Sequence, residues 1–195
     1  MNNKMKQVIL AFVLVIAAIL GLNHKQLSLI TDGIDLLTSN NATAKSEVTF
    51  VKHVDGDTSK FRINGKVKTV RYLLIDTPET VKPNTPIQPY GKEASNFTKK
   101  ALTHAHKIQL DYDKTGNKGD KYNRTLAYVY VDGKDLNEEL VKKGLARVAY
   151  VYKPNTKNEA KYLEAQKYAK SHHLGIWSKK GYVTNRGYNP NVYNH

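Results

Sequence analysis

The sequence predicts a β-barrel with helices: a five-stranded OB-type barrel with about three packed α-helices, an α+β fold. Two features of the 195 residues carry this prediction. Runs with the period of a β-strand occur three times, are interrupted by one helical segment, and then occur twice more. Further helical segments follow the last run. This order is typical of a small barrel with helices packed around it.

The first three expected strands cover residues 47–54, 57–63 and 66–75, where apolar and polar residues alternate. Asn64-Gly65 separates the second run from the third, and this dipeptide is the strongest short signal for a hairpin turn. The pattern changes to a helical period over residues 90–106. One face of that expected helix is apolar and consists of Ala94, Phe97, Ala101, Leu102 and Ala105.

The second half of the domain begins with two expected strands, 107–113 and 124–131, joined by the polar loop 114–123. Asp135 and Glu138 then form a capping box for a short helix, which we expect Gly144 to end. An extended or strand-like segment follows over residues 145–152. A last helix is expected around residues 158–173.

The termini differ in composition from the barrel. Lys4 and Lys6 precede an uninterrupted apolar run over residues 8–22, the layout of a secretory signal. We therefore divide the chain into a signal peptide or signal anchor (1–24), a linker (25–46), the barrel domain (47–178) and a flexible tail (179–195). The lysines at the start predict an extracellular location for the remainder. The chain is then either tethered to the membrane through residues 8–22 or secreted after their removal.

Composition restricts the chemistry. The chain has 31 Lys and Arg against 17 Asp and Glu, a formal charge of +14, which favours a polyanionic partner such as nucleic acid. A basic protein with no particular ligand has the same composition, so charge alone does not decide. There is no cysteine, which excludes disulfides, thiol nucleophiles and cysteine-bound zinc.

Acidic residues gather where the expected strands begin and end. Asp55 and Asp57 flank Gly56 before the second strand, and the third strand ends in Asp76-Thr77-Pro78-Glu79. If the hairpin pairs these strands, the acids meet at one edge of the barrel beside Arg71. Carboxylate and carbonyl oxygens are hard ligands that suit Ca²⁺ or Mg²⁺. Each acid taken alone is more simply explained as a turn or cap residue.

Several ordered motifs now point to one family. They are VDGDT (54–58), DTPET (76–80), YGKEAS (90–95), LVKKGLARVAYVYKPN (140–155) and GIW (175–177). From Val48 to Trp177 the chain resembles the staphylococcal nuclease (thermonuclease) family. Each motif is a modest signal, but the ordered set is highly specific.

The resemblance assigns roles to individual residues. It implies one Ca²⁺ ion held by Asp57, Asp76 and the main-chain oxygen of Thr77, with Asp55 helping to orient the site. It implies catalysis by Arg71, Glu79 and Arg124. It also implies a pocket for the nucleotide's phosphate and base, made by Lys121, Tyr122, Tyr150 and Tyr152.

One position departs from the family's pattern. The glycine that usually precedes the second arginine is Asn123 here. Asparagine adopts a left-handed backbone more readily than most residues, so we expect Arg124 still to point into the site.

Three functions compete at this point. The resemblance implies a monomeric, Ca²⁺-dependent nuclease that cleaves DNA and RNA and leaves 3′-phosphates and 5′-hydroxyls. The same barrel without catalysis would be a single-strand-binding module at the cell surface. A third reading is a basic attachment protein that binds acidic wall polymers. All three catalytic residues and both metal aspartates are present, and we therefore favour the nuclease.

Overall fold

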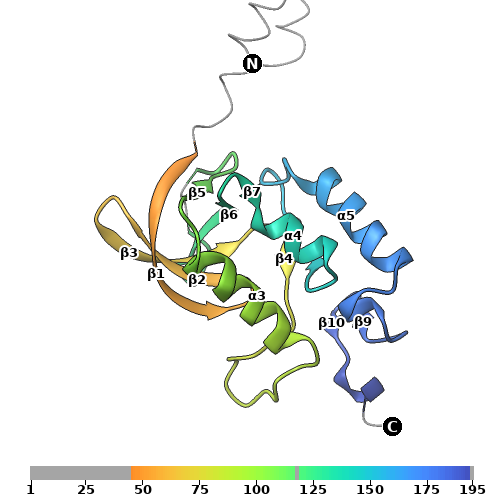
Figure 1. The fold of residues 1–195 in the computed structure, drawn as a ribbon. Helices are drawn as coiled ribbons and strands as arrows, with labels where there is room; N and C mark the ends of the chain where they lie inside the picture. Colours follow the sequence, from red (N-terminus) through yellow and green to blue (C-terminus); the bar gives the residue numbers. More distant parts are fainter. Residues whose placement is uncertain (1–44, 117–118, 194–195) are drawn as a thin grey trace, which may run out of the picture. The chain divides into compact units, whose positions relative to one another are not determined.

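The structure is a computed structural model that describes residues 45–116 and 119–193 (Figure 1). Its centre is a closed barrel of five strands, confirming the expected fold class. These are β1 (Ser46–Asp55), β2 (Thr58–Ile63), β3 (Lys66–Tyr72), β5 (Ile108–Asp111) and β6 (Thr125–Val131). The strands follow the order β3-β2-β1-β5-β6, and a pairing between β3 and β6 closes the barrel. That closing pair is parallel and the others are antiparallel, so the barrel is mixed.

The hairpin between β2 and β3 forms where the sequence predicts it. Asn64 and Gly65 both have positive φ, 48° and 78°, as a two-residue turn of this kind requires. The turn fixes the register from Ile63 opposite Lys66 to Thr58 opposite Arg71. The start of β2 and the far end of β3 therefore lie side by side.

Within residues 45–116 and 119–193, three α-helices accompany the barrel: α3 (Gly91–Thr103), α4 (Leu136–Lys142) and α5 (Glu159–Ser171). The Asp135 side chain caps α4 by accepting a hydrogen bond from the Glu138 N–H, and Gly144 follows the helix with a φ of 67°. These features were predicted. Buried Asn137 links α4 to the barrel, since its amide accepts from Val129 N–H and donates to the Leu73 carbonyl.

The core fills the barrel and the space beneath the helices. Its fully buried members come from strands and helices alike, so both contribute apolar surface to one core. Representative members are Phe61, Val70, Tyr72, Leu110, Tyr128, Leu140 and Tyr162.

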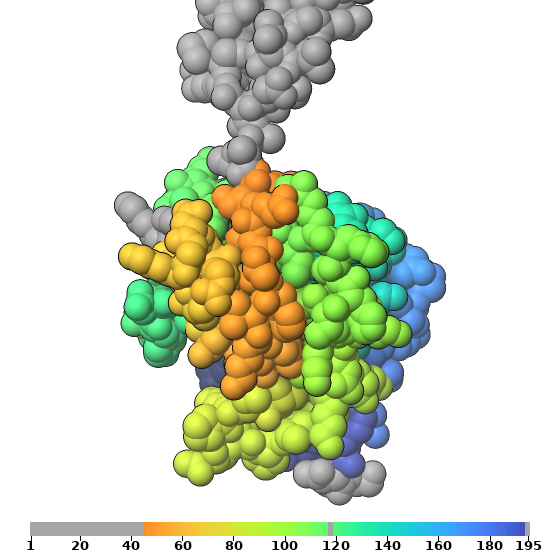
Figure 2. Space-filling view, turned by 60° about the vertical axis from the view of Figure 1, so that its left-hand side comes forward, coloured from red at the N-terminus to blue at the C-terminus, as the bar shows by residue number. Residues whose placement is uncertain are grey.

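A long loop connects the two-residue strand β4 (Ile75–Asp76) to α3. In Figure 2 it forms a yellow-green lobe that extends beyond β1 (orange) and α3 (green). Strand β4 pairs with β8 (Arg147–Val148), which brings residue 147 next to Asp76. The residues that begin this loop therefore lie at one end of the barrel.

The segment expected to be a flexible tail instead packs against the domain in its described part, residues 179–193. After the 3₁₀ turn η1 (Gly175–Trp177), strands β9 (Val183–Thr184) and β10 (Gly187–Tyr188) form a small hairpin, and a second 3₁₀ turn, η2 (Pro190–Tyr193), follows. Tyr182 is fully buried and donates a hydrogen bond to the Pro89 carbonyl (2.5 Å). The sequence lacks periodicity here because tertiary contacts of tyrosines, not a repeating apolar face, hold the segment.

The predicted signal or anchor segment, including the tether over residues 8–22, lies outside the described residues. So does most of the predicted linker. Within the described part of the chain, no helix has the length and apolar character needed to cross a membrane.

Candidate active site

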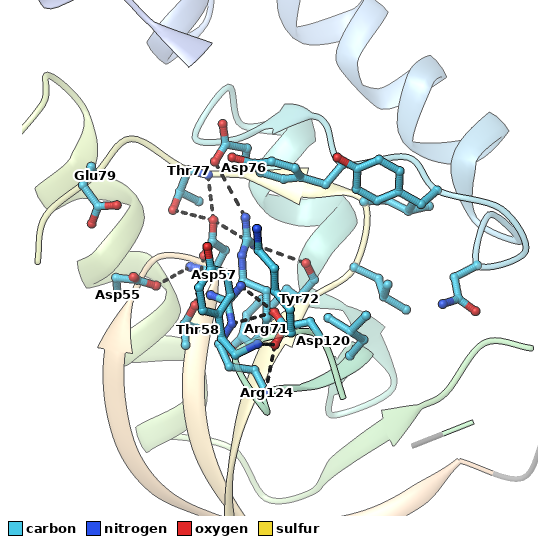
Figure 3. Close-up of a pocket in the computed structure, with 18 of the residues that line it drawn as sticks. Asp55, Asp57, Thr58, Arg71, Tyr72, Asp76, Thr77, Glu79, Asp120 and Arg124 are labelled. Atoms are coloured by element: carbon cyan, nitrogen blue, oxygen red, sulfur yellow. Dashed lines mark hydrogen bonds and ion pairs between the residues drawn. The ribbon is translucent and has the colours of Figure 1, made fainter. Parts of the chain in front are cut away.

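A cleft of about 680 Å³ opens at the end of the barrel where β2 begins and β3 ends (Figure 3). All ten residues to which the resemblance assigned a catalytic, metal or substrate role line this cleft. They are Asp57, Arg71, Asp76, Thr77, Glu79, Lys121, Tyr122, Arg124, Tyr150 and Tyr152.

Asp57 lies at the centre of the site, in the turn between β1 and β2. Its Oδ2 accepts hydrogen bonds from the Thr77 N–H (2.9 Å) and the Thr77 hydroxyl (3.1 Å). Gly56 permits this approach, since a Cβ at that position would lie 2.7 Å from Thr77 Oγ1. The turn and the loop after β4 are thereby joined, as the sequence predicted from the hairpin.

Arg71 projects from β3 between two aspartates. Its Nη1 lies 2.9 Å from Asp57 Oδ2 and its Nη2 lies 3.7 Å from Asp76 Oδ1. Only 11% of the Arg71 side chain is exposed, so the two carboxylates offset the cost of removing most of its charge from water. Asp76 also binds Arg147, whose Nε lies 2.9 Å from Asp76 Oδ2.

The acids of the site are crowded: Asp57 is buried, and Asp55 and Asp76 are partly buried. Burial, followed by the charge of Asp57, raises the pKa of Asp55 to about 7. The same two causes raise the pKa of Asp76 above its ordinary value. Carboxylates placed together in this way form a hard-oxygen donor set whose repulsion a divalent cation would relieve.

No group of three or more His, Asp or Glu is arranged as a preformed metal site in the part of the chain that the structure describes. Asp57 and Asp76 instead bind arginines and Thr77. The residue types therefore fit a hard cation of the kind the sequence predicts, with Asp57, Asp76 and the Thr77 carbonyl as the donors available at this end of the cleft.

Glu79 is held by the loop that it begins. Its Oε1 accepts hydrogen bonds from three successive main-chain N–H groups, those of Thr80, Val81 and Lys82, at 3.0–3.1 Å. Its own N–H donates to the Gln88 side chain (2.8 Å), which closes the loop. Among the described residues, Oε2 has no hydrogen-bond partner, so this oxygen is able to accept a proton or orient a water in the cleft. In Figure 3 Glu79 and Arg124 are drawn apart, with Asp57 between them.

Arg124 reaches the cleft with the help of Asn123, whose φ of 57° confirms the predicted left-handed backbone. Its fork binds Asp120, with Nε and Nη2 at 2.9 and 2.7 Å from Oδ2. Asp120 Oδ1 also accepts from the N–H groups of Tyr122 and Arg124. The sequence reasoning missed Asp120, although its position four residues before Arg124 was a readable signal.

Three tyrosines border the cleft with exposed rings: Tyr122 is 67% exposed, Tyr150 55% and Tyr152 71%. Arginine guanidinium groups lie near two of the rings, Arg71 at 5.4 Å from Tyr150 and Arg124 at 5.3 Å from Tyr122. The expectation of an extended segment fails at Tyr150, whose φ is 54°. The bend nevertheless leaves both Tyr150 and Tyr152 on the cleft.

Two further residues contact the site, and no local sequence pattern predicts their contacts. Arg147 binds Asp76 from β8, and the Tyr188 hydroxyl donates to the Asp76 carbonyl (2.5 Å) from the C-terminal hairpin. Both are far from Asp76 in sequence and meet it only through tertiary packing.

Comparison with known proteins gives a family match and several similar proteins. Residues 69–179 match the family model described as Staphylococcal nuclease homologue. Among similar proteins, the SPbeta prophage-derived endonuclease YokF of Bacillus subtilis (strain 168) is 59% identical over 143 residues, 73% of this chain but 48% of that protein. Endonuclease YncB of the same organism is 56% identical over 77% of this chain and 71% of its own length.

A third relative, the thermonuclease of Staphylococcus hyicus, is 41% identical over 175 residues. That alignment covers 89% of this chain and 99% of the relative. The chain thus spans about half the length of YokF but almost all of this thermonuclease. With a matching family model over most of the domain and a relative covered almost end to end, this chain belongs to the staphylococcal nuclease family.

Proposed function

We propose that the protein is an extracellular, Ca²⁺-dependent nuclease that hydrolyses phosphodiester bonds of DNA and RNA to 3′-phosphate products. One observation carries the proposal: Arg71, Glu79 and Arg124 line the same cleft as Asp57 and Asp76. Three exposed tyrosines border that cleft. A module that only bound nucleic acid would need the tyrosines and the positive charge, but not this combination of acids and arginines.

The two arginines bind the phosphate in this proposal. A guanidinium is a planar fork that can donate two parallel hydrogen bonds to phosphate oxygens, and lysine cannot reproduce that geometry. Arg71 and Arg124 are each bound to carboxylates in the structure. Their partners hold the forks in the cleft, where charge develops on the phosphate during hydrolysis.

Glu79 positions the attacking water. Its Oε1 is fixed by three N–H groups, so Oε2 is presented to the cleft in a defined direction. It takes a proton from the water as the new bond to phosphorus forms. The bond from phosphorus to the 5′-oxygen breaks, that oxygen takes up a proton from solvent water and leaves as a hydroxyl, and the phosphate stays on the 3′-oxygen.

Asp57, Asp76 and the Thr77 carbonyl are the proposed Ca²⁺ ligands, and the bound ion would act as a Lewis acid on a phosphate oxygen. Two hydrogen bonds orient Asp57. Asp55 Oδ1 accepts from the Asp57 N–H at 3.1 Å, and the Thr77 N–H donates to Asp57 Oδ2 at 2.9 Å. Lys121 and Tyr122 form one wall for the nucleotide. Tyr150 and Tyr152 form another, on which a base can stack.

The location and assembly are part of the same proposal. Lys4 and Lys6 before an apolar run support export, with residues 8–22 as either a membrane tether or a removable signal. We propose that the protein acts as a monomer, since the proposed catalytic and binding residues all come from one chain.

A zymogram on DNA tests activity, metal and location together. Culture medium, washed membranes and cytosol from cells that express the full chain are compared with and without EGTA. We expect a cleared band in medium or membranes that EGTA abolishes. Activity confined to the cytosol would contradict export, and activity that survives EGTA would contradict Ca²⁺ dependence. DNA binding without any clearing would favour the non-catalytic binding module.

A further inference from the structure

A second cleft, of about 570 Å³, lies next to the candidate active site. Its walls come from the segment around β8, from α5, from η1 and from the C-terminal hairpin β9–β10. Figure 1 places that hairpin beside the end of α5, with β4 nearby. The match to the family model ends at residue 179, so the hairpin lies beyond the part of the chain that the family model describes.

The lining of this second cleft is positively charged. It includes Arg147, Lys170 and Arg186, and no Asp or Glu occurs among the described residues that line it. Arg147 is neutralised by Asp76 at 2.9 Å. Lys170 and Arg186 are exposed, and no ion pair is found for either within the described ranges. The Lys170 Nζ lies over the ring of Trp177, 4.5 Å from its centroid, a contact that supplies no compensating acid. Two cations therefore remain to attract an anion.

The two clefts share a wall. Tyr150 and Tyr152 line both of them, and both rings are more than half exposed. A chain of stacked bases that leaves the active site across these rings would enter the second cleft. Its phosphates would then pass between Lys170 on α5 and Arg186 in the hairpin turn.

The hairpin is held in place by the active site itself. The Tyr188 hydroxyl donates to the Asp76 carbonyl at 2.5 Å, and Arg147 donates to the Thr184 carbonyl at 3.3 Å. Tyr182, just before the hairpin, is fully buried. The turn that carries Arg186 is therefore fixed relative to the cleft in which we propose hydrolysis.

We propose that this second cleft is an additional subsite for single-stranded nucleic acid, in which Lys170 and Arg186 bind backbone phosphates beyond the nucleotides at the scissile bond. The shared tyrosines connect it to the active site. The inference rests on the proposed nuclease function, because it assumes that the first cleft holds nucleic acid. It adds a prediction that the function alone does not make. Longer single strands should bind more tightly than short ones, and residues of the C-terminal hairpin should contribute to that difference.

Binding is measured on the full chain carrying Glu79→Gln, in Ca²⁺, with a labelled dinucleotide and a labelled single strand of about ten nucleotides. Lys170→Ala, Arg186→Ala and the double variant are added to this background. Their matched controls are Lys167→Ala, one turn earlier on α5, and Lys180→Ala; both lysines are exposed and neither lines the cleft. Thermal unfolding of every variant establishes that it is folded.

We expect the double variant to reduce affinity for the long strand about tenfold relative to affinity for the dinucleotide. The slope of log affinity against log salt should fall by about 0.7 for each cation removed, as for single strands in general. The control variants should change neither the affinity ratio nor the slope by a comparable amount.

Two results would overturn the subsite. One is an equal loss for the long strand and the dinucleotide; the other is an equal effect of Lys180→Ala and Arg186→Ala, which would indicate only diffuse attraction. Failure of the nuclease proposal is distinguishable. It would appear as a lack of hydrolysis by the unsubstituted chain, whereas the binding comparison in the Glu79→Gln background does not depend on hydrolysis.

Discussion

At the scale of single residues, the site depends on two arginines in different surroundings. The Arg71 side chain lies between Asp57 and Asp76 and is 11% exposed, whereas the Arg124 side chain is 30% exposed and bound to Asp120. Both present a fork to the same cleft. Their shape, and not only their charge, should therefore matter for turnover.

Arg71→Lys and Arg124→Lys keep the net charge and so should leave the long-range attraction for DNA nearly unchanged. Each should lower kcat by about 10²–10³, the usual loss for one donor to the transition state. Because both act on one phosphate in the proposed mechanism, the double variant should lose less than the product of the two single losses. The measurements are the steady-state kcat and the DNA affinity of the two single variants and the double variant.

The control is Arg62→Lys, since Arg62 is exposed on β2 and does not line the cleft. It should keep the parent kcat. Near-normal turnover in either active-site lysine variant would show that this arginine is a surface charge.

The resemblance to the staphylococcal nuclease family implied the ten residues of the candidate site, because they lie in or beside the motifs that carry it. It missed the residues that hold them. Arg147 and Tyr188 contact Asp76 from 71 and 112 positions away. Such contacts depend on how β8 and the C-terminal hairpin pack, and no local pattern encodes that.

At the scale of elements, the turn before β6 determines where Arg124 points. Asn123 has a φ of 57°, and Asp120 accepts both N–H groups that flank this position. Asn123 therefore adopts a left-handed backbone conformation that glycine would adopt at little cost.

Asn123→Ala should destabilise the protein by about 1 kcal/mol, because a left-handed backbone costs about that much for an ordinary L-residue. It should also lower kcat by shifting Arg124. Asn123→Gly removes the steric penalty and should keep kcat near that of the parent. Denaturant unfolding and kinetics of the two variants test this; equal behaviour of alanine and glycine would show that the backbone conformation is unimportant.

The elements themselves were predictable to different degrees. The β2–β3 hairpin, α3, α4 and α5 follow from Asn-Gly, a helical period and a cap, which are local signals. The C-terminal hairpin was not predictable, since β9 and β10 have two residues each. Buried tyrosines stabilise it through contacts with distant main chain, and a sequence pattern of glycine, asparagine and tyrosine does not reveal them.

At the scale of the whole molecule, the net charge of +14 favours attraction of a polyanion such as nucleic acid. The acids that line the cleft repel the phosphates of such a partner locally. A cation bound by those acids would remove this conflict. Metal binding should consequently stabilise the fold, because the unfolded chain has no such site.

Ca²⁺ at a concentration of 100 times its Kd should raise the free energy of unfolding by about 2.7 kcal/mol. Asp57→Asn and Asp76→Asn should each weaken this stabilisation, since each removes the charge of one proposed ligand. Thermal unfolding with and without Ca²⁺ measures the effect. A matched control, Asp132→Asn, changes an acid that lies outside the cleft and should retain the full Ca²⁺ effect. Full Ca²⁺ stabilisation in the Asp57 and Asp76 variants would mean that the ion binds elsewhere.

The most direct test of the central claim, that this cleft hydrolyses phosphodiesters with Glu79 as the base, separates binding from chemistry in the full-length Glu79→Gln variant. Glutamine keeps an oxygen that can accept from the N–H groups of residues 80–82, so folding, Ca²⁺ binding and nucleotide binding should persist. Single-turnover hydrolysis of a labelled oligonucleotide should slow by about 10²–10⁴. Hydrolysis at the parent rate, or loss of Ca²⁺ binding together with activity, would contradict the role assigned to Glu79.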